Sequence, residues 1–122
     1  MKKSILLTLI CSICMSMLLT SCGENGGGGS AADVHVFYYT YSDPYITSVR
    51  SALDKELKDA DISFQDYDGN GNQTTQTEQV QTAITKGAKA IAVNIVNTGS
   101  DDAANGVINL ARNAGIPVIF FS

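Results

Sequence analysis

The sequence lacks the glycine-rich motifs that usually hold phosphate groups. Neither G-x-G-x-x-G nor a glycine-rich loop ending in Lys-Ser or Lys-Thr occurs among its 122 residues. A nucleotide-binding site of the usual kind is therefore not expected. Positive charge is also scarce, with 8 Lys and Arg against 12 Asp and Glu. Such an acidic chain argues against nucleic acid as a partner, because the phosphate backbone is bound by clusters of Lys and Arg.

Groups that commonly carry catalysis are rare as well. His35 is the single histidine, and it stands near the start of a predicted strand, with no serine, cysteine or carboxylate placed to work with it. We interpret it as a solvated residue at the end of that strand. The sequence shows no nucleophile motif and no cluster of metal ligands. It therefore favours a protein without enzymatic activity, and we expect no cofactor or metal within this chain.

All three cysteines fall within the first 22 residues. Lys2 and Lys3 precede an uncharged apolar run over 5–19, which is the layout of an export signal and is short for a membrane span. The run ends in "LTSC", which resembles the cleavage box of bacterial lipoproteins. That resemblance implies cleavage before Cys22 and acylation of its thiol. An ordinary signal peptide with an incidental cysteine is the alternative.

The C-x-x-C spacing of Cys11 and Cys14 is typical of redox or metal pairs, but both residues lie in the signal that cleavage would remove. The remaining chain would then have no disulfide and would depend on packing for its stability. Loss of Lys2 and Lys3 would change the formal charge from −4 to −6. We expect an exported protein, anchored by lipid to the extracytoplasmic face of the cell membrane.

The sequence predicts three regions. They are a lipoprotein signal peptide (1–21), a lipidated cysteine with a flexible Gly/Ser-rich linker (22–32), and a folded domain (33–122). In the last of these, apolar runs alternate with helical stripes. The expected strands cover 34–40, 62–67, 90–96 and 117–121, and the expected helices cover 44–60, 76–86 and 101–114. This order predicts the α/β class, with an open, mostly parallel sheet and helices on both of its faces.

The stretch "DYDGNG" over 66–71 matches the opening of a calcium-binding loop. The bidentate glutamate of such a loop should stand at its twelfth position, which is Thr77, whereas Glu78 comes one residue late. The stretch also follows a predicted strand instead of a helix. We therefore interpret it as a turn rich in Asp, Asn and Gly.

The stretch "YYTYSDPYI" over 38–46 follows the first predicted strand. In open parallel sheets ligands bind beyond the carboxyl ends of the strands, near the point where the strand order reverses. For a 2-1-3-4 order this point lies at the ends of the first and third strands. Asp43 before Pro44 is a standard helix cap, although Ser42 is an alternative cap. With Tyr45 beside it, Asp43 also suits a neutral sugar, because a carboxylate accepts from vicinal hydroxyls and a ring covers the C–H face. The chemistry alone leaves both roles open.

Three stretches carry a resemblance to a known family. "YTYSDPYITSVRSAL", "KGAKAIAVNIV" and "ARNAGIPVIFFS" resemble the N-terminal part of the bacterial galactose/glucose-binding lipoproteins. Those are type I periplasmic sugar-binding proteins that serve ABC transporters. The similarity runs from about residue 33 to the last residue. It implies a solute-binding lipoprotein that captures a hexose for an ABC importer and contacts the importer's permease. A sugar-sensing receptor module of the same fold, signalling to a chemoreceptor or kinase, is the alternative.

The resemblance also implies roles for particular residues. At the position of Asp43 the family has an acid that binds sugar hydroxyls, and at the position of Tyr45 it has an aromatic ring that stacks on the sugar. Ser122 stands where an asparagine normally contacts the sugar, which is a departure from the pattern. Members of the family fold as two domains and are more than twice this length. We therefore expect this chain to be an incomplete N-terminal domain, with any calcium site of the family outside it.

Overall fold

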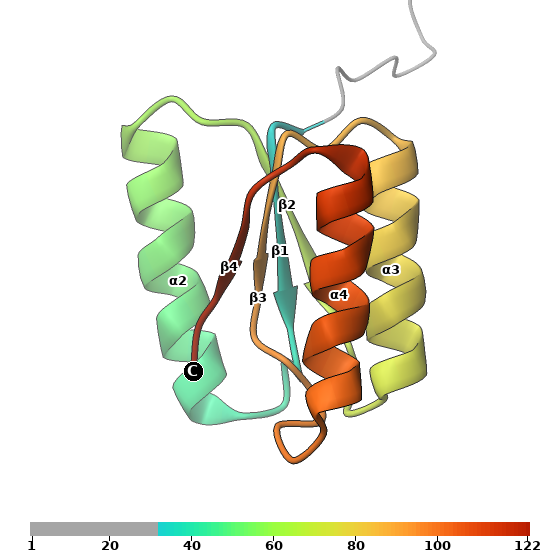
Figure 1. Ribbon diagram of the computed structural model, residues 1–122. Coiled ribbons are helices and arrows are strands. Elements are labelled where there is room, and N and C mark those ends of the chain that lie inside the picture. The colour runs from blue at the N-terminus through green and yellow to red at the C-terminus, as the bar shows by residue number, and fades with distance from the viewer. Residues whose placement is uncertain (1–31) are drawn as a thin grey trace, which may run out of the picture.

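The computed structural model describes residues 32–122 (Figure 1). The expected signal peptide and Cys22 lie outside the described residues. Strands and helices alternate along the chain, as predicted. The elements are β1 (Val34–Tyr38), α2 (Pro44–Asp59), β2 (Phe64–Asp68), α3 (Gln73–Thr85), β3 (Ala90–Val93), α4 (Asp101–Ala114) and β4 (Val118–Phe120).

The four strands form one parallel sheet in the order β2-β1-β3-β4. Helix α2 covers one face, and α3 and α4 lie together on the other (Figure 1). The predicted open parallel sheet with helices on both faces and a 2-1-3-4 strand order is therefore confirmed. All four strands run in the same direction, so their carboxyl ends meet at one edge of the sheet, at the bottom of Figure 1.

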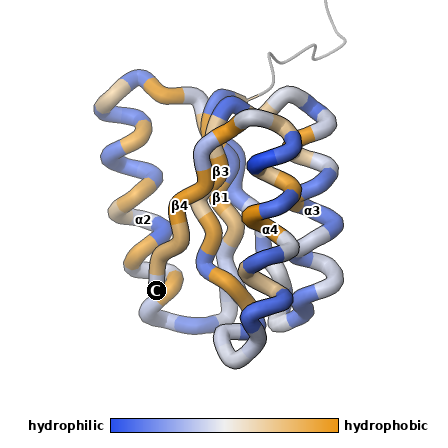
Figure 2. The backbone as a smooth tube through the Cα atoms, viewed as in Figure 1, coloured by the Kyte–Doolittle hydropathy of each residue, from blue (hydrophilic) through white to orange (hydrophobic). Residues whose placement is uncertain are grey.

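Alternation along β1 divides the core between the two faces. Phe37 faces α3 and α4 and packs in a cluster with Val80 and Val107. Val36 and Tyr38 face α2 and pack with Ile46. Figure 2 shows hydrophobic residues concentrated along β1, β3 and β4, with hydrophilic residues on the outer sides of the helices.

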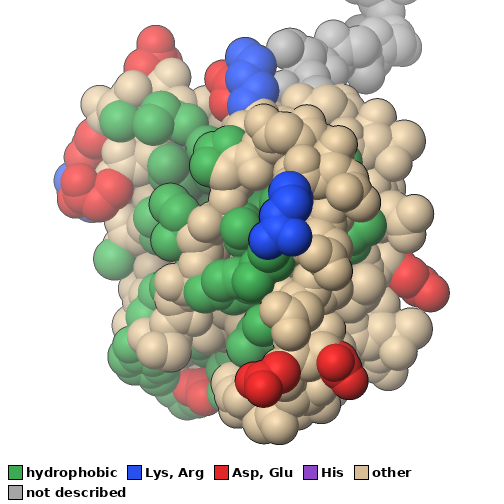
Figure 3. Space-filling view, in the orientation of Figure 1, with side chains coloured by type: hydrophobic (Ala, Val, Ile, Leu, Met, Phe, Trp, Pro, Cys, Tyr) green, Lys and Arg blue, Asp and Glu red, His purple; other side chains and the backbone are tan. Residues whose placement is uncertain are grey.

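The face covered by α2 is only partly closed. Beside α2 the sheet continues to β4, where Ile119 faces the same side as Ala92 and is 64% exposed. Hydrophobic side chains are visible in this region, between α2 and β4, in Figure 3. Because β4 is also an edge strand, one side of its backbone has no neighbouring strand among the described residues.

His35 is not the solvated residue that we expected. It is 3% exposed, and its ring stacks on Tyr67 of β2. Nε2 lies 3.0 Å from the carbonyl oxygen of Ala32, and Nδ1 lies 2.9 Å from the Tyr67 hydroxyl. Since a carbonyl only accepts, Nε2 donates and Nδ1 accepts. The interpretation was wrong because it considered only the position along the strand, whereas pairing with β2 brings Tyr67 over the ring. Burial lowers the pKa of His35.

The first half of the "DYDGNG" stretch belongs to the end of β2, and only its second half, from Gly69, forms the expected turn before α3. Asp68 Oδ1 accepts from the backbone N–H groups of Asn70 (2.8 Å) and Tyr41 (3.1 Å). Asn70 and Gly71 adopt left-handed φ angles of 51° and 67°. A Cβ on Gly69 would lie 2.9 Å from the carbonyl oxygen of Tyr38, so this close approach requires glycine. Within residues 32–122, no three His, Cys, Asp or Glu side chains group in a way that would hold a metal ion.

None of the helices between residues 32 and 122 combines the length and the apolar character that crossing a membrane requires. The element bounds differ from prediction chiefly at two places. Helix α3 begins at Gln73 instead of residue 76, because Asn72 caps it by accepting from the N–H of Thr75 at 3.0 Å. Strand β3 ends at Val93 instead of residue 96. The side chain of Gln76, in α3, binds the backbone that follows.

Candidate binding site

A cavity of about 350 Å³ lies beyond the carboxyl ends of β1 and β3. Its walls come from the segment after β1, the first turn of α2, the segment after β3 and the residue that ends the chain. The residues that line it are Tyr39, Asp43, Tyr45, Ile46, Asn94, Ile95, Val96, Thr98 and Ser122. The three predicted ligand contacts, Asp43, Tyr45 and Ser122, are therefore brought together around one space.

Asp43 is the cap of helix α2, and Ser42, the alternative cap, is not. Asp43 Oδ1 accepts from the backbone N–H of Tyr45 at 2.7 Å. Oδ2 accepts from the Tyr39 hydroxyl. The Tyr39 hydrogen bond, followed by that of the Tyr45 N–H, lowers the pKa of Asp43. Both bonds therefore favour the ionised form of the carboxylate.

Capping does not use up the acceptor capacity of Asp43. An ionised carboxylate offers about four lone-pair positions. The Tyr45 N–H and the Tyr39 hydroxyl occupy two of them, and the Ile46 N–H also contributes. Acceptor capacity therefore remains on a side chain that lines the cavity. The two roles that the sequence left open are thus geometrically compatible in one residue.

Tyr45 is the exposed aromatic of the cavity, with 59% of its surface accessible. It lies in the first turn of α2, and its hydroxyl donates a long hydrogen bond of 3.5 Å to the carbonyl oxygen of Ser122. The apolar side chains of Ile46, Ile95 and Val96 line the same space. The site therefore combines a charged acceptor with apolar surface.

Comparison with known proteins decides the family. Residues 34–122 match the family model described as a periplasmic binding protein domain. The chain belongs to this family. It is 36% identical over 95 residues to the D-galactose/methyl-galactoside binding periplasmic protein of Haemophilus influenzae, an alignment that covers 75% of this chain and 28% of that protein.

A second relative of this binding-protein domain is the ribose import binding protein of Bacillus subtilis. It is 23% identical over 128 residues, which cover 98% of this chain and 40% of that protein. Among solved structures, the myo-inositol binding protein of Caulobacter aligns with a TM-score of 0.67 and 26% identity, over 75% of this chain and 30% of that one. The resemblance to type I periplasmic sugar-binding proteins is confirmed. The chain spans less than half the length of each relative.

The sequence reasoning missed Asn94, which lies at the floor of this binding-protein domain's cavity. Asn94 is 7% exposed. Its Oδ1 accepts from the Tyr39 N–H at 3.1 Å, and its Nδ2 donates to the Phe121 carbonyl oxygen at 3.0 Å. The available signal was a polar amide inside the apolar run "AIAVNIV". Thr98, also missed, had no comparable signal.

Gln76 of α3 holds the backbone on either side of Ile95. It is fully buried, its Nε2 donates to the Asn94 carbonyl oxygen at 2.9 Å, and its Oε1 accepts from the Val96 N–H at 3.1 Å. The N–H of Asn94 still pairs with β1, and beyond it these bonds take the place of strand pairing. The predicted strand is shortened for this reason.

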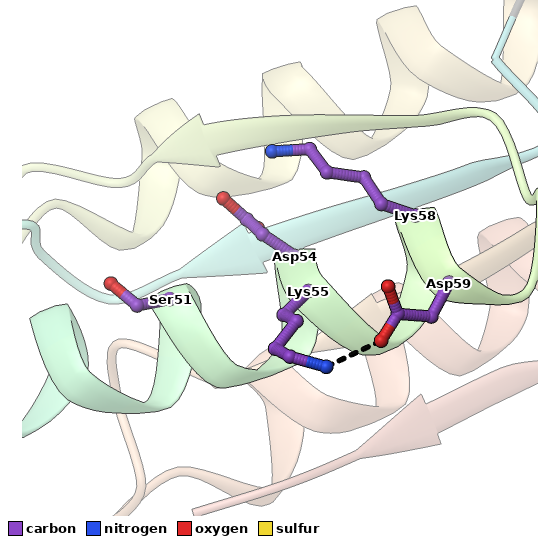
Figure 4. A pocket seen from close by; sticks show the side chains of 5 residues that line it. All are labelled: Ser51, Asp54, Lys55, Lys58 and Asp59. Carbon is purple, nitrogen blue, oxygen red and sulfur yellow. Dashed lines mark hydrogen bonds and ion pairs between the residues drawn. The ribbon is translucent and has the colours of Figure 1, made fainter.

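A separate hollow lies on the later turns of helix α2 (Figure 4). Its lining residues are Ser51, Asp54, Lys55, Lys58 and Asp59, all from one helix. Lys55 forms an ion pair with Asp59, whereas Asp54 and Lys58 reach toward the sheet in Figure 4. With one wall only, this surface is a groove between side chains and does not enclose a ligand.

Asp54 takes part in a carboxyl pair between α2 and β2. Asp66 lies on the face of β2 that is turned to α2, and it can hydrogen-bond to Asp54 only when one of the two carboxyl groups is protonated. Burial is the main cause that raises the pKa of Asp66 to about 7, and the neighbouring Asp54 adds to it. The positive charges of Arg50 and Lys58 lower that pKa in part. Among the described residues, Oδ1 of each carboxyl group and the nearby Tyr38 hydroxyl are buried without a hydrogen-bond partner.

Proposed function

We propose that this domain binds a sugar in the cavity formed by Asp43 and Tyr45, as part of a solute-binding lipoprotein that supplies an ABC importer. The observation that carries the proposal is the pairing of a carboxylate that retains acceptor capacity with an exposed aromatic ring in the same cavity. Vicinal hydroxyls donate to such a carboxylate, and the ring covers the C–H face of the sugar. The function is binding without catalysis.

For the ligand we propose a hexose of the galactose or glucose kind. The relatives are named for galactose, ribose and myo-inositol, so a polyhydroxylated ring is their common feature. Ser122 lines the cavity but carries one short hydroxyl where the resemblance implies an amide. A hydroxyl cannot reproduce the two-point contact of an amide. We therefore expect the preference among these sugars to differ from that of the galactose-binding relative.

For the setting we propose export, a lipid anchor at Cys22 on the extracytoplasmic face of the membrane, and delivery of the sugar to a permease. The apolar run and "LTSC" motif support the anchor. Family membership supports the extracytoplasmic location and the importer.

The function is tested by calorimetric titration of galactose, glucose, ribose and myo-inositol into a protein of full family length that carries this domain. Asp43→Asn retains the size and much of the capping ability of the residue but weakens acceptance from hydroxyls. Each hydrogen bond to a charged group contributes about 1.5–3 kcal/mol. Affinity should therefore fall about tenfold or more.

The control is Asn72→Ala. Asn72 caps α3 with a hydrogen bond of 3.0 Å, and it does not line the cavity. Loss of this cap should cost about 0.5–2 kcal/mol of stability and leave sugar affinity unchanged. If Asp43→Asn retained full affinity and only lowered the melting temperature, Asp43 would be a helix cap and nothing more. If the wild type bound none of the four sugars, the proposed function would be wrong.

A further inference from the structure

Asn94 stands where the sheet opens into the cavity. Its backbone N–H still pairs with β1, donating to the Phe37 carbonyl oxygen at 2.8 Å. Beyond this point β1 and β4 leave the sheet on either side of β3, and the side chain of Asn94 continues the pairing. Oδ1 accepts from the Tyr39 N–H and Nδ2 donates to the Phe121 carbonyl oxygen, at 3.1 and 3.0 Å. One side chain therefore connects three chain segments past the ends of their strands.

The segment after β1, held at Tyr39, and the segment after β4, held at Phe121, carry opposite walls of the cavity. Tyr39 donates its hydroxyl to Asp43, the proposed sugar acceptor. Phe121 precedes Ser122, whose carbonyl oxygen accepts from the Tyr45 hydroxyl. Because Gln76 donates to the backbone carbonyl oxygen of Asn94 at 2.9 Å, the backbone that carries this amide cannot shift without breaking a buried hydrogen bond.

We propose that Asn94 is a positioning residue of the sugar cavity, which sets the separation between the wall that bears Asp43 and the wall that bears Ser122. This inference rests on the proposed sugar-binding function. An amide suits the role because it donates and accepts at once from one short side chain. A carboxylate of the same shape only accepts, and a serine hydroxyl is too short to reach both partners.

Asn94→Asp tests this role through its pH dependence. When ionised, the carboxylate still accepts from the Tyr39 N–H, but it faces the Phe121 carbonyl oxygen, and two acceptors repel. When protonated, the group donates to that oxygen and restores both bonds. Burial beside a carbonyl raises the pKa of a carboxyl group. We expect Asn94→Asp to bind sugar about tenfold more weakly than wild type at pH 8 and to approach wild-type affinity at pH 5.

The wild type provides the reference at both pH values. The pKa of Asp43 is lowered, so Asp43 stays ionised at pH 5 and its contribution to affinity should not change. Asn97→Asp is the control for the added charge, because Asn97 is exposed and stands three residues further along the same segment. It should retain wild-type affinity at both pH values. Asn94→Ser, which carries no charge, should lose affinity at pH 5 and at pH 8 alike.

A double-mutant cycle separates positioning from direct contact. If Asn94 acts through the wall that bears Asp43, the losses caused by Asn94→Asp and Asp43→Asn should be less than additive at pH 8. Full additivity would overturn the positioning role, and so would wild-type affinity in Asn94→Asp or Asn94→Ser. A wild type that bound no sugar would instead overturn the proposed function and, with it, this inference.

Discussion

The carboxyl pair of Asp54 and Asp66 should make the stability of the domain depend on pH in a direction opposite to most acidic residues. Asp66 has a pKa raised to about 7, against about 3.9 for an unperturbed aspartate in the unfolded chain. The folded state therefore binds the proton more tightly. This contribution is fully present below the unfolded pKa, near pH 4, and it is lost as the pH rises through about 7.

The size of the effect follows from the shift. A difference of about three pKa units corresponds to about 4 kcal/mol for a group cut off from solvent. Asp66 is only half-buried, and Arg50 and Lys58 lower its pKa in part. Solvent screening therefore reduces the expected loss of stability between pH 5 and pH 8 to roughly 1–2 kcal/mol.

Asp66→Asn removes this titration and retains the shape of the side chain. Its amide donates to the Asp54 carboxylate at every pH, so the variant should lose less stability than wild type between pH 5 and pH 8. At pH 8 it should be the more stable protein, by roughly 1–2 kcal/mol. The assay is urea unfolding of the protein of full family length at pH 5, 6, 7 and 8. Comparison at the same pH cancels contributions from other residues, including His35, whose lowered pKa acts in the opposite direction.

Glu56→Gln is the matched control, because Glu56 is an exposed carboxylate on α2, the helix that carries Asp54. Its unfolding curves should follow those of the wild type at all four pH values. The reasoning is refuted if Asp66→Asn declines with pH as steeply as wild type, or if it is the less stable protein at pH 8. Either result would mean that the two carboxyl groups do not share a proton across the interface between α2 and β2.

Two further predictions concern the anchor and the exposed edge. Expression in a bacterium with labelled fatty acid should label the protein, and Cys22→Ala should abolish the label; a variant that retained it would contradict acylation at Cys22. Residues 33–122 produced alone should associate, because Ile119 is 64% exposed beside the unpaired side of β4. A sharp, concentration-independent melt of a monomer in sedimentation and calorimetry would contradict this.

The sequence predicts those parts of the fold that depend on local signals. Helix α4 begins and ends as predicted, because Asp101 and Asp102 favour its first turn and Gly115 takes up a left-handed φ of 70° at its end. Asp43 and Tyr45 could be placed together at the cavity from the sequence because they are close along the chain and follow a strand. The start of α3 was missed because its first turn is polar, and only the cap at Asn72 defines it.

Features that depend on distant partners were not predictable in this way. Asn94 and Tyr39 are 55 residues apart, and nothing in the periodicity of either segment indicates that their polar groups meet. The burial of His35 likewise depends on Tyr67, which is 32 residues away. Spacing along the chain reports which face a residue lies on, but the pairing of strands decides what that face meets.

The bond between His35 and Ala32 fixes where a segment attached to the start of β1 would join this domain. Nε2 of His35 holds the Ala32 carbonyl oxygen at 3.0 Å, at the edge of the sheet opposite to the cavity (Figure 1). The five residues of β1 separate the two edges by about 17 Å. An anchor or an affinity tag attached ahead of Ala32 therefore joins the domain behind its binding face. A tether at that point would therefore leave the cavity uncovered.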